Sequence, residues 1–205
     1  MKTTRAFLTI AAGCTALTVP LRAAESGEAP SPIARTQMKS AGELIKKQAP
    51  PVIAHDLAEK ITPENSRILV SLARQRACLM LDDRIYIDAP VSTGKHSATT
   101  PAGTFSILEK DTEHRSITHG DFVDKSGTVV RSGISMRVDA ASSGTHFVST
   151  PMRYFCRLNA AGLGIHAGIL PGYPSSHGSI RMHEDIARLF FLKVKVGTPV
   201  EIRAD

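Results

Sequence analysis

The chain has 205 residues, of which 42% are hydrophobic and 21% charged, with 12 Pro, 15 Gly, 3 Cys and no Trp. These values are ordinary for a globular protein and exclude a collagen-like chain, a disulfide scaffold and a wholly disordered chain. The length allows one domain of about 100–200 residues and a tail. No apolar run reaches the roughly 18 residues that a membrane-spanning helix needs.

The formal net charge is +6, but part of it lies in the first 24 residues. Without the three basic residues of that segment, 22 basic residues stand against 19 acidic ones, a net charge of +3. No run of basic residues is interleaved with aromatic ones, so nucleic-acid binding is not expected.

The segment 1–24 has the pattern of a secretory signal peptide. Two basic residues, at positions 2 and 5, precede a stretch of small and apolar residues that Pro20 ends, and Ala23–Ala24 suit a signal peptidase. A buried N-terminal helix is the weaker alternative, because Pro20 and Gly13 do not suit one. We therefore expect an exported protein, located in the periplasm or cell envelope.

Cysteine usage leaves two questions open. Ala11–Cys14 resembles a bacterial lipobox, in which Cys14 would carry a lipid anchor, as the alternative to cleavage near Ala23–Ala24. After cleavage near Ala24, Cys78 and Cys156 remain. They could pair in an oxidising compartment, but their apolar neighbours favour free, buried thiols. With no Cys cluster, no structural zinc site is expected.

Residues 25–65 are polar and Pro-rich, and predict a linker or N-terminal extension with short helices near 40–48 and 55–60. From residue 66 to 205 the pattern becomes that of one β-rich domain. Apolar runs and period-two alternation predict strands at 68–72, 76–81, 84–88, 104–108, 153–158, 164–166 and 200–202.

One helix is predicted in this domain. Glu184 and Asp185 would lie in its first turn, where acidic groups suit the helix dipole, and Ile186, Leu189 and Phe190 form one apolar face. Residues 110–150 are polar, with short β-prone pieces such as 127–131. A long and weakly patterned stretch inside a domain is typical of a lid or a binding loop.

The most informative stretch is Gly164–Met182, GIHAGILPGYPSSHGSIRM. His166 lies 13 residues before Ser179 and could take its proton, which a hydroxyl nucleophile requires. Gly178 permits a sharp turn that brings backbone N–H donors close to a bound carbonyl. A metal site on His166, His177 and His183 is a weaker alternative, because no helical His pair or carboxylate partner supports it.

These residues resemble the signature of the L,D-transpeptidase (YkuD-type) catalytic domain family: a His, a variable loop, then Ser-His-Gly-Cys-hydrophobic-Arg/Asn. Here Ser176–Arg181 reads SHGSIR. The family's other elements are matched in the same order, over about residues 66–203, by the strand 68–72, Gln75, Ser92–Lys95 (STGK), Thr100–Phe105 (TPAGTF) and Gly197–Val200 (GTPV). The resemblance implies a mainly β, sandwich-like fold with one or two short helices.

One residue departs from the family pattern, because position 179 is Ser where the family has its nucleophilic Cys. A thiolate forms readily beside a His, whereas an alcohol must lose its proton during attack. Cys156 lies on a predicted strand ten residues before His166 and is no evident substitute.

The resemblance also implies a role for each residue. Ser179 would attack a peptidoglycan stem peptide at the bond before its terminal D-alanine, and His166 would be the base, oriented by the backbone carbonyl near it, at Ala167. The N–H groups of Gly178 and Ser179 would form the oxyanion hole. The residues expected to shape the pocket and bind the substrate are Ser176, His177, Arg181, Tyr154 and Met152.

The leading hypothesis is thus an exported, peptidoglycan-modifying acyl transferase. It would need no cofactor, because a nucleophile, a base and backbone donors suffice for acyl transfer. Two alternatives remain: a degenerate module that binds stem peptides without turnover, and an L,D-carboxypeptidase that uses water as acceptor. The sequence specifies no oligomeric state.

Overall fold

The computed structural model describes residues 48–96 and 99–205, all of which belong to the unit Lys39–Asp205. The predicted signal peptide, Cys14 and most of the helix expected at 40–48 lie outside the described residues. Strands dominate the described part, and α2 (Glu184–Lys193) is the predicted helix, with Glu184 and Asp185 in its first turn. The mainly β prediction is therefore confirmed. No helix in the described part is long and apolar enough to cross a membrane.

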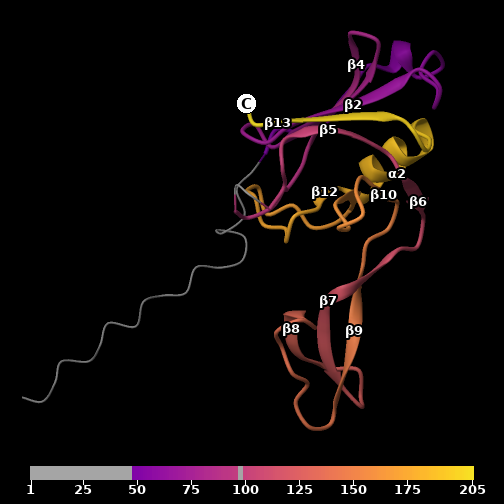
Figure 1. The fold of residues 1–205 in the computed structure, drawn as a ribbon. Coiled ribbons are helices and arrows are strands. Elements are labelled where there is room, and N and C mark those ends of the chain that lie inside the picture. Colours follow the sequence, from indigo (N-terminus) through magenta and orange to yellow (C-terminus); the bar gives the residue numbers. More distant parts are fainter. Residues whose placement is uncertain (1–47, 97–98) are drawn as a thin grey trace, which may run out of the picture. The chain divides into compact units, whose positions relative to one another are not determined.

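The largest sheet has six strands in the order β1-β4-β3-β2-β13-β5. The last strand, β13, pairs in parallel with β2, so that Val200 lies opposite Ile68 and Ile202 opposite Val70. Figure 1 shows β13 (yellow) beside β2 (indigo). All four side chains are buried, as the apolar alternation requires. The bounds are β1 (Val52–Ile53), β2 (Ser66–Ser71), β3 (Arg76–Leu81), β4 (Arg84–Pro90), β5 (Gly103–Ser106) and β13 (Pro199–Arg203).

A second sheet has four strands in the order β12-β11-β10-β6. Its parallel pair, β11 and β12, sets His166 opposite Arg181, and this register positions the site. The predicted strand at 153–158 is shorter than expected, because Tyr154 has a φ of 55° and breaks the extended backbone. The bounds are β6 (Glu109–Asp111), β10 (Phe155–Arg157), β11 (Gly164–Ala167) and β12 (Ile180–Met182).

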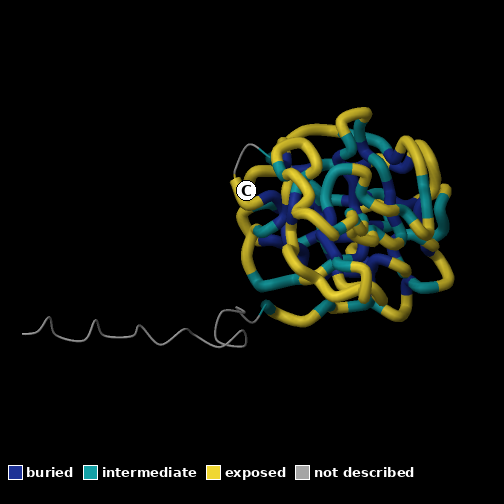
Figure 2. Tube along the Cα trace, turned by 90° about the horizontal axis from the view of Figure 1, so that it is seen from below, coloured by how far each residue is buried: buried dark blue, intermediate teal, exposed yellow. Residues whose placement is uncertain are grey.

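The hydrophobic core lies where these two sheets and α2 meet. The helix contributes Ile186, Ala187 and Phe190, which are all buried. They join one cluster with buried residues of both sheets, among them Leu79, Ile87, Ile165, Ile180 and Met182. In Figure 2 the buried stretches of the tube, in dark blue, lie mainly in the interior, behind exposed stretches in yellow. Both thiols, Cys78 and Cys156, are buried and unpaired, as expected, and burial raises their pKa values to about 11 and about 12.

The stretch 110–150, expected to be a lid or binding loop, is largely folded as a sheet. Three antiparallel strands, in the order β8-β7-β9, form what we call the outer sheet: β7 (Arg115–Asp124), β8 (Val129–Ser135) and β9 (Thr145–Pro151). In Figure 1 it lies below the other two sheets. Few of its side chains are buried, chiefly Phe122, Val123 and Ile134. This explains why the sequence pattern is weak there.

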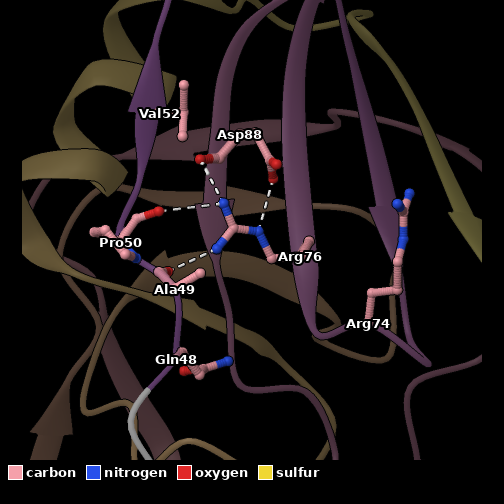
Figure 3. A pocket seen from close by; sticks show the side chains of 7 residues that line it. All are labelled: Gln48, Ala49, Pro50, Val52, Arg74, Arg76 and Asp88. Atoms are coloured by element: carbon pink, nitrogen blue, oxygen red, sulfur yellow. Dashed lines mark hydrogen bonds and ion pairs between the residues drawn. The ribbon is translucent and has the colours of Figure 1, made fainter.

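The segment before residue 66, expected to be part of a linker, packs on the large sheet from residue 48 onward. Strand β1 pairs with β4, and Leu57, in the 3-10 helix η1 (His55–Leu57), is buried together with Ile61. Figure 3 shows the Arg76 guanidinium between Asp88 and the carbonyls of Ala49 and Pro50. The sheet therefore binds this segment through both its backbone and its side chains.

Candidate active site

The central pair of the site is His166 on β11 and Ser179, which immediately precedes β12. Because the two strands are parallel neighbours, residues 13 positions apart in the chain come together. The His166 Nε2 lies 2.9 Å from the Ser179 Oγ. This distance is within hydrogen-bond range for a nucleophile and its base.

A backbone carbonyl fixes the orientation of His166. Its Nδ1 lies 2.7 Å from the carbonyl oxygen of Ala167. A carbonyl can only accept, so Nδ1 carries the proton and donates it. The Nε2 is then unprotonated and accepts the hydroxyl hydrogen of Ser179, which is the tautomer that a general base needs.

His166 is kept neutral by its surroundings. Its side chain is buried, and this burial lowers its pKa to about 4, with smaller contributions in the same direction from the charges of Arg181 and His114. The hydrogen bond to Ala167 acts in the opposite direction. Phe155 lies beside His166, with ring centroids 6.3 Å apart, and stacks on His114 at 4.1 Å. The imidazole therefore remains uncharged at neutral pH.

Hydroxyl groups hold the loop before Ser179. The Ser176 hydroxyl donates to the Ser179 carbonyl at 2.5 Å and accepts from the Gly178 N–H at 3.0 Å. Thr100 donates to the Gly178 carbonyl at 2.6 Å and accepts from the Gly94 N–H at 2.8 Å. The segments matched in the sequence as STGK and TPAGTF thus support this loop from one side.

Gly178 cannot be replaced without strain. Its φ is +138°, and a Cβ at this position would lie 2.8 Å from the carbonyl oxygen of Thr99. Its N–H, expected in the oxyanion hole, is bonded to Ser176 in this structure. Among the described residues the Ser179 N–H has no hydrogen-bond partner. Two N–H groups were expected to donate in the oxyanion hole. Within the described residues, only that of Ser179 is free of a hydrogen bond and available to a substrate oxygen.

A cavity of about 1630 Å³ adjoins the pair and contains both His166 and Ser179 in its wall. Of the expected substrate-binding residues, Met152, His177 and Arg181 line it. Ser176 and Tyr154 are not among the residues that line it. Ser176 is fully buried and its hydroxyl is used within the loop. The Tyr154 ring contacts Phe191 of α2 instead.

The outer sheet forms part of the cavity wall, in the stretch 110–150 where a lid or binding loop was expected, but its individual lining residues were not predicted. Its strand β7 carries His119, which stacks on His177 with ring centroids 4.2 Å apart and an angle of 18° between the rings. Arg137, just after β8, lines the same cavity. No sequence signal marks these two residues, because they lie in the weakly patterned stretch 110–150.

A metal centre on His166, His177 and His183 receives no support from the geometry. In residues 48–96 and 99–205, no group of three His, Cys, Asp or Glu side chains could hold a metal ion. His166 contacts Ser179, and His177 contacts His119.

The comparisons with known proteins agree with the motif. A model of the L,D-transpeptidase catalytic domain family matches residues 65–202. An L,D-transpeptidase from Mycobacterium smegmatis has a TM-score of 0.52 and 19% identity, over 68% of this chain and 59% of that one. The structure of LD transpeptidase LdtMt1 in complex with imipenem has a TM-score of 0.51 and 21% identity, over 68% and 59%.

At such identities the solved structures show likeness of fold. The chain spans about three fifths of the length of both proteins. No curated protein matches it. The family model, however, covers more than half of the chain, including the Ser179 loop and the strand of His166. The chain therefore belongs to the L,D-transpeptidase catalytic domain family.

Proposed function

We propose that this protein is a serine-dependent acyl transferase that acts on peptidoglycan stem peptides at the bond before the terminal D-alanine. The observation that carries the proposal is the 2.9 Å contact between the His166 Nε2 and the Ser179 Oγ, with the Nδ1 fixed on Ala167. Family membership supports the substrate class, and the cavity beside Ser179 has room for a peptide.

In the first step the Ser179 Oγ attacks the carbonyl carbon, and His166 takes the hydroxyl proton at Nε2. The Ser179 N–H donates to the oxygen that becomes negative. When the tetrahedral intermediate collapses, the C–N bond breaks and His166 returns the proton to the amine of the departing D-alanine. An ester joins the remaining peptide to Ser179.

In the second step an amine of another stem, or water, attacks this ester. His166 accepts a proton from the acceptor and returns one to the Ser179 oxygen as the ester breaks. An amine acceptor gives a cross-link, and water gives a trimmed peptide, which is the L,D-carboxypeptidase alternative.

The state of His166 is compatible with a serine nucleophile. A thiolate–imidazolium pair requires a charged His, and the burial of His166 opposes that charge. A neutral His that accepts the serine proton during attack needs no resting charge. The low pKa is thus compatible with the residue that is present at position 179.

We propose to test the nucleophile by mass spectrometry of stem tetrapeptides incubated with the protein. Ser179→Ala removes the hydroxyl, Ser179→Cys restores the family residue, and Ser132→Ala is the control, because Ser132 is exposed on β8 outside the cavity. Loss of D-alanine or new cross-links should occur with wild type and the control, and disappear in the Ala variant. An inactive wild type beside an active Cys variant would instead support the binding-module alternative.

We also propose that the protein is exported, on the basis of the basic start, apolar stretch and small residues of the segment 1–24. Mass analysis of the mature N-terminus would test this. A chain that begins after Ala23 or Ala24 supports a soluble product, and a lipidated Cys14 supports an anchored one. A chain retaining residues 1–24 in full would contradict export.

A further inference from the structure

The wall of the cavity carries more positively than negatively charged side chains. It contains one carboxylate, Glu184, and this group is paired with Arg153 at 3.0 Å. Another arginine of the wall, Arg157, is paired with Glu109 at 2.6 Å. Arg137 and Arg181 also line the cavity, and neither has an acidic partner among the described residues.

Arg181 is held close to the nucleophile. It lies two residues after Ser179, and its Cγ and Cδ pack so closely on Gly168 that a Cβ there would be 3.1 Å from both. Its guanidinium has one long contact, 3.4 Å to the Ser175 hydroxyl. A guanidinium stays charged in proteins, and a partly buried one is stabilised by an anion that it can bind.

The stacked pair His119 and His177 lies in the same positive surroundings. The pKa of His119 is lowered first by burial and then by the charges of Arg137, Arg181 and Lys95. The pKa of His177 is lowered first by burial and then by His119, Lys95 and Arg181. Both rings are therefore neutral at neutral pH, and a neutral imidazole offers one N–H donor.

We propose that Arg137, Arg181 and the His119–His177 pair form a carboxylate-binding subsite, which holds the free C-terminal carboxylate of the peptide that Ser179 attacks. The inference rests on the proposed function. If the attacked bond precedes the last residue, the terminal carboxylate lies one residue beyond the reacting carbonyl, a step of about 3.8 Å between Cα atoms. His177 and Arg181 lie two residues before and after Ser179, and all four residues of the subsite line the same cavity as Ser179.

The outer sheet thereby takes part in selecting the substrate. His119 comes from β7 of this sheet and Arg137 from the turn after β8, whereas His177 and Arg181 come from the loop and strand around Ser179. A peptide with a free terminal carboxylate contacts both sides of the cavity. A peptide whose terminus is an amide keeps its other contacts but loses the charge-assisted hydrogen bonds.

Calorimetric titration of the full chain in a Ser179→Ala background would test this without turnover. The ligands are a stem tetrapeptide ending in free D-alanine and the same peptide ending in D-alaninamide. The acid should bind about tenfold more tightly than the amide, and Arg137→Gln should remove about that factor for the acid alone. Arg181→Gln should act in the same direction, and Arg181→Lys should restore part of the preference.

Lys125→Gln is the matched control, because it removes the same charge from an exposed turn of the outer sheet away from the cavity. It should leave both affinities unchanged. Equal binding of acid and amide, an equal loss in Lys125→Gln and Arg137→Gln, or no binding of either peptide would overturn the subsite. The two proposals can fail separately. If the wild type releases no D-alanine but the Ser179→Ala variant still prefers the acid, the subsite stands and the proposed reaction is refuted.

Discussion

At the scale of single residues, His166 should set the pH range of the proposed reaction. The base must be neutral to accept the Ser179 proton, and burial lowers the pKa of His166 to about 4. The specificity constant kcat/KM for D-alanine release should therefore stay level as the pH falls through about 6.5, where an ordinary His becomes charged. It should fall to half near pH 4.

A pH profile of D-alanine release, with circular dichroism at each pH to confirm folding, checks this prediction. A half-maximal rate near pH 6.5 would contradict it and would mean that His166 is more hydrated than its buried position implies.

The same scale shows what a sequence can reveal about the site. His166, Ser179 and Arg181 could be identified because they lie within one short stretch of recognisable order. The role of Ser176 could not, because a hydroxyl can bind a ligand or its own backbone, and only the folded loop shows that it binds backbone. His119 lies 58 residues before its partner His177 and meets it through tertiary contact alone.

At the scale of elements, Lys110 joins the second sheet to the end of α2. Its Nζ donates to the carbonyls of Phe191 and Val194 at 2.7 and 2.6 Å, and lies 4.2 Å from the centre of the Phe191 ring. The last carbonyls of a helix have no partner within the helix. Lys110→Met should lower the free energy of unfolding by about 1–3 kcal/mol, since two partly buried carbonyls lose their donor.

Thermal and denaturant unfolding of Lys110→Met beside Lys125→Met, in an exposed turn, would measure this contribution. Equal stability of the two variants would show that water bonds the two carbonyls as well as the lysine does, with no net loss in the free energy of unfolding.

The strands that could be predicted are those that bury one face. Strands β2, β3, β4 and β13 carry alternating or continuous apolar residues, because they face the common core. The outer sheet buries few side chains, so its strands have no apolar period and were expected to form a loop. Backbone pairing, which leaves no mark on composition, holds β7 to both of its neighbours.

At the scale of the whole molecule, residues 48–65 are part of the fold. Their prolines suggested a linker, yet Leu57 and Ile61 are fully buried, and Lys193 donates to the carbonyls of Ala58 and Ile61. A chain that begins at residue 66 should be less stable than one that begins at 48 by roughly 3–6 kcal/mol, the contribution of two buried aliphatic side chains.

Unfolding of the two truncated chains in urea would measure this difference, and Leu57→Ala with Ile61→Ala in the longer chain separates side-chain burial from the pairing of β1. Equal midpoints for the two lengths would mean that the segment adds nothing to stability.

The group that orients His166 is the main-chain carbonyl of Ala167 rather than a side chain. Side-chain replacement does not delete a main-chain carbonyl, so mutagenesis cannot detect this member of the proposed catalytic set. Saturation mutagenesis of the chain, scored for activity in variants that fold, should identify positions 166 and 179 as intolerant. At position 167 it should report only whether the new side chain fits the buried space. A search for an essential carboxylate as a third partner should therefore find none, although the proposed reaction uses a third group.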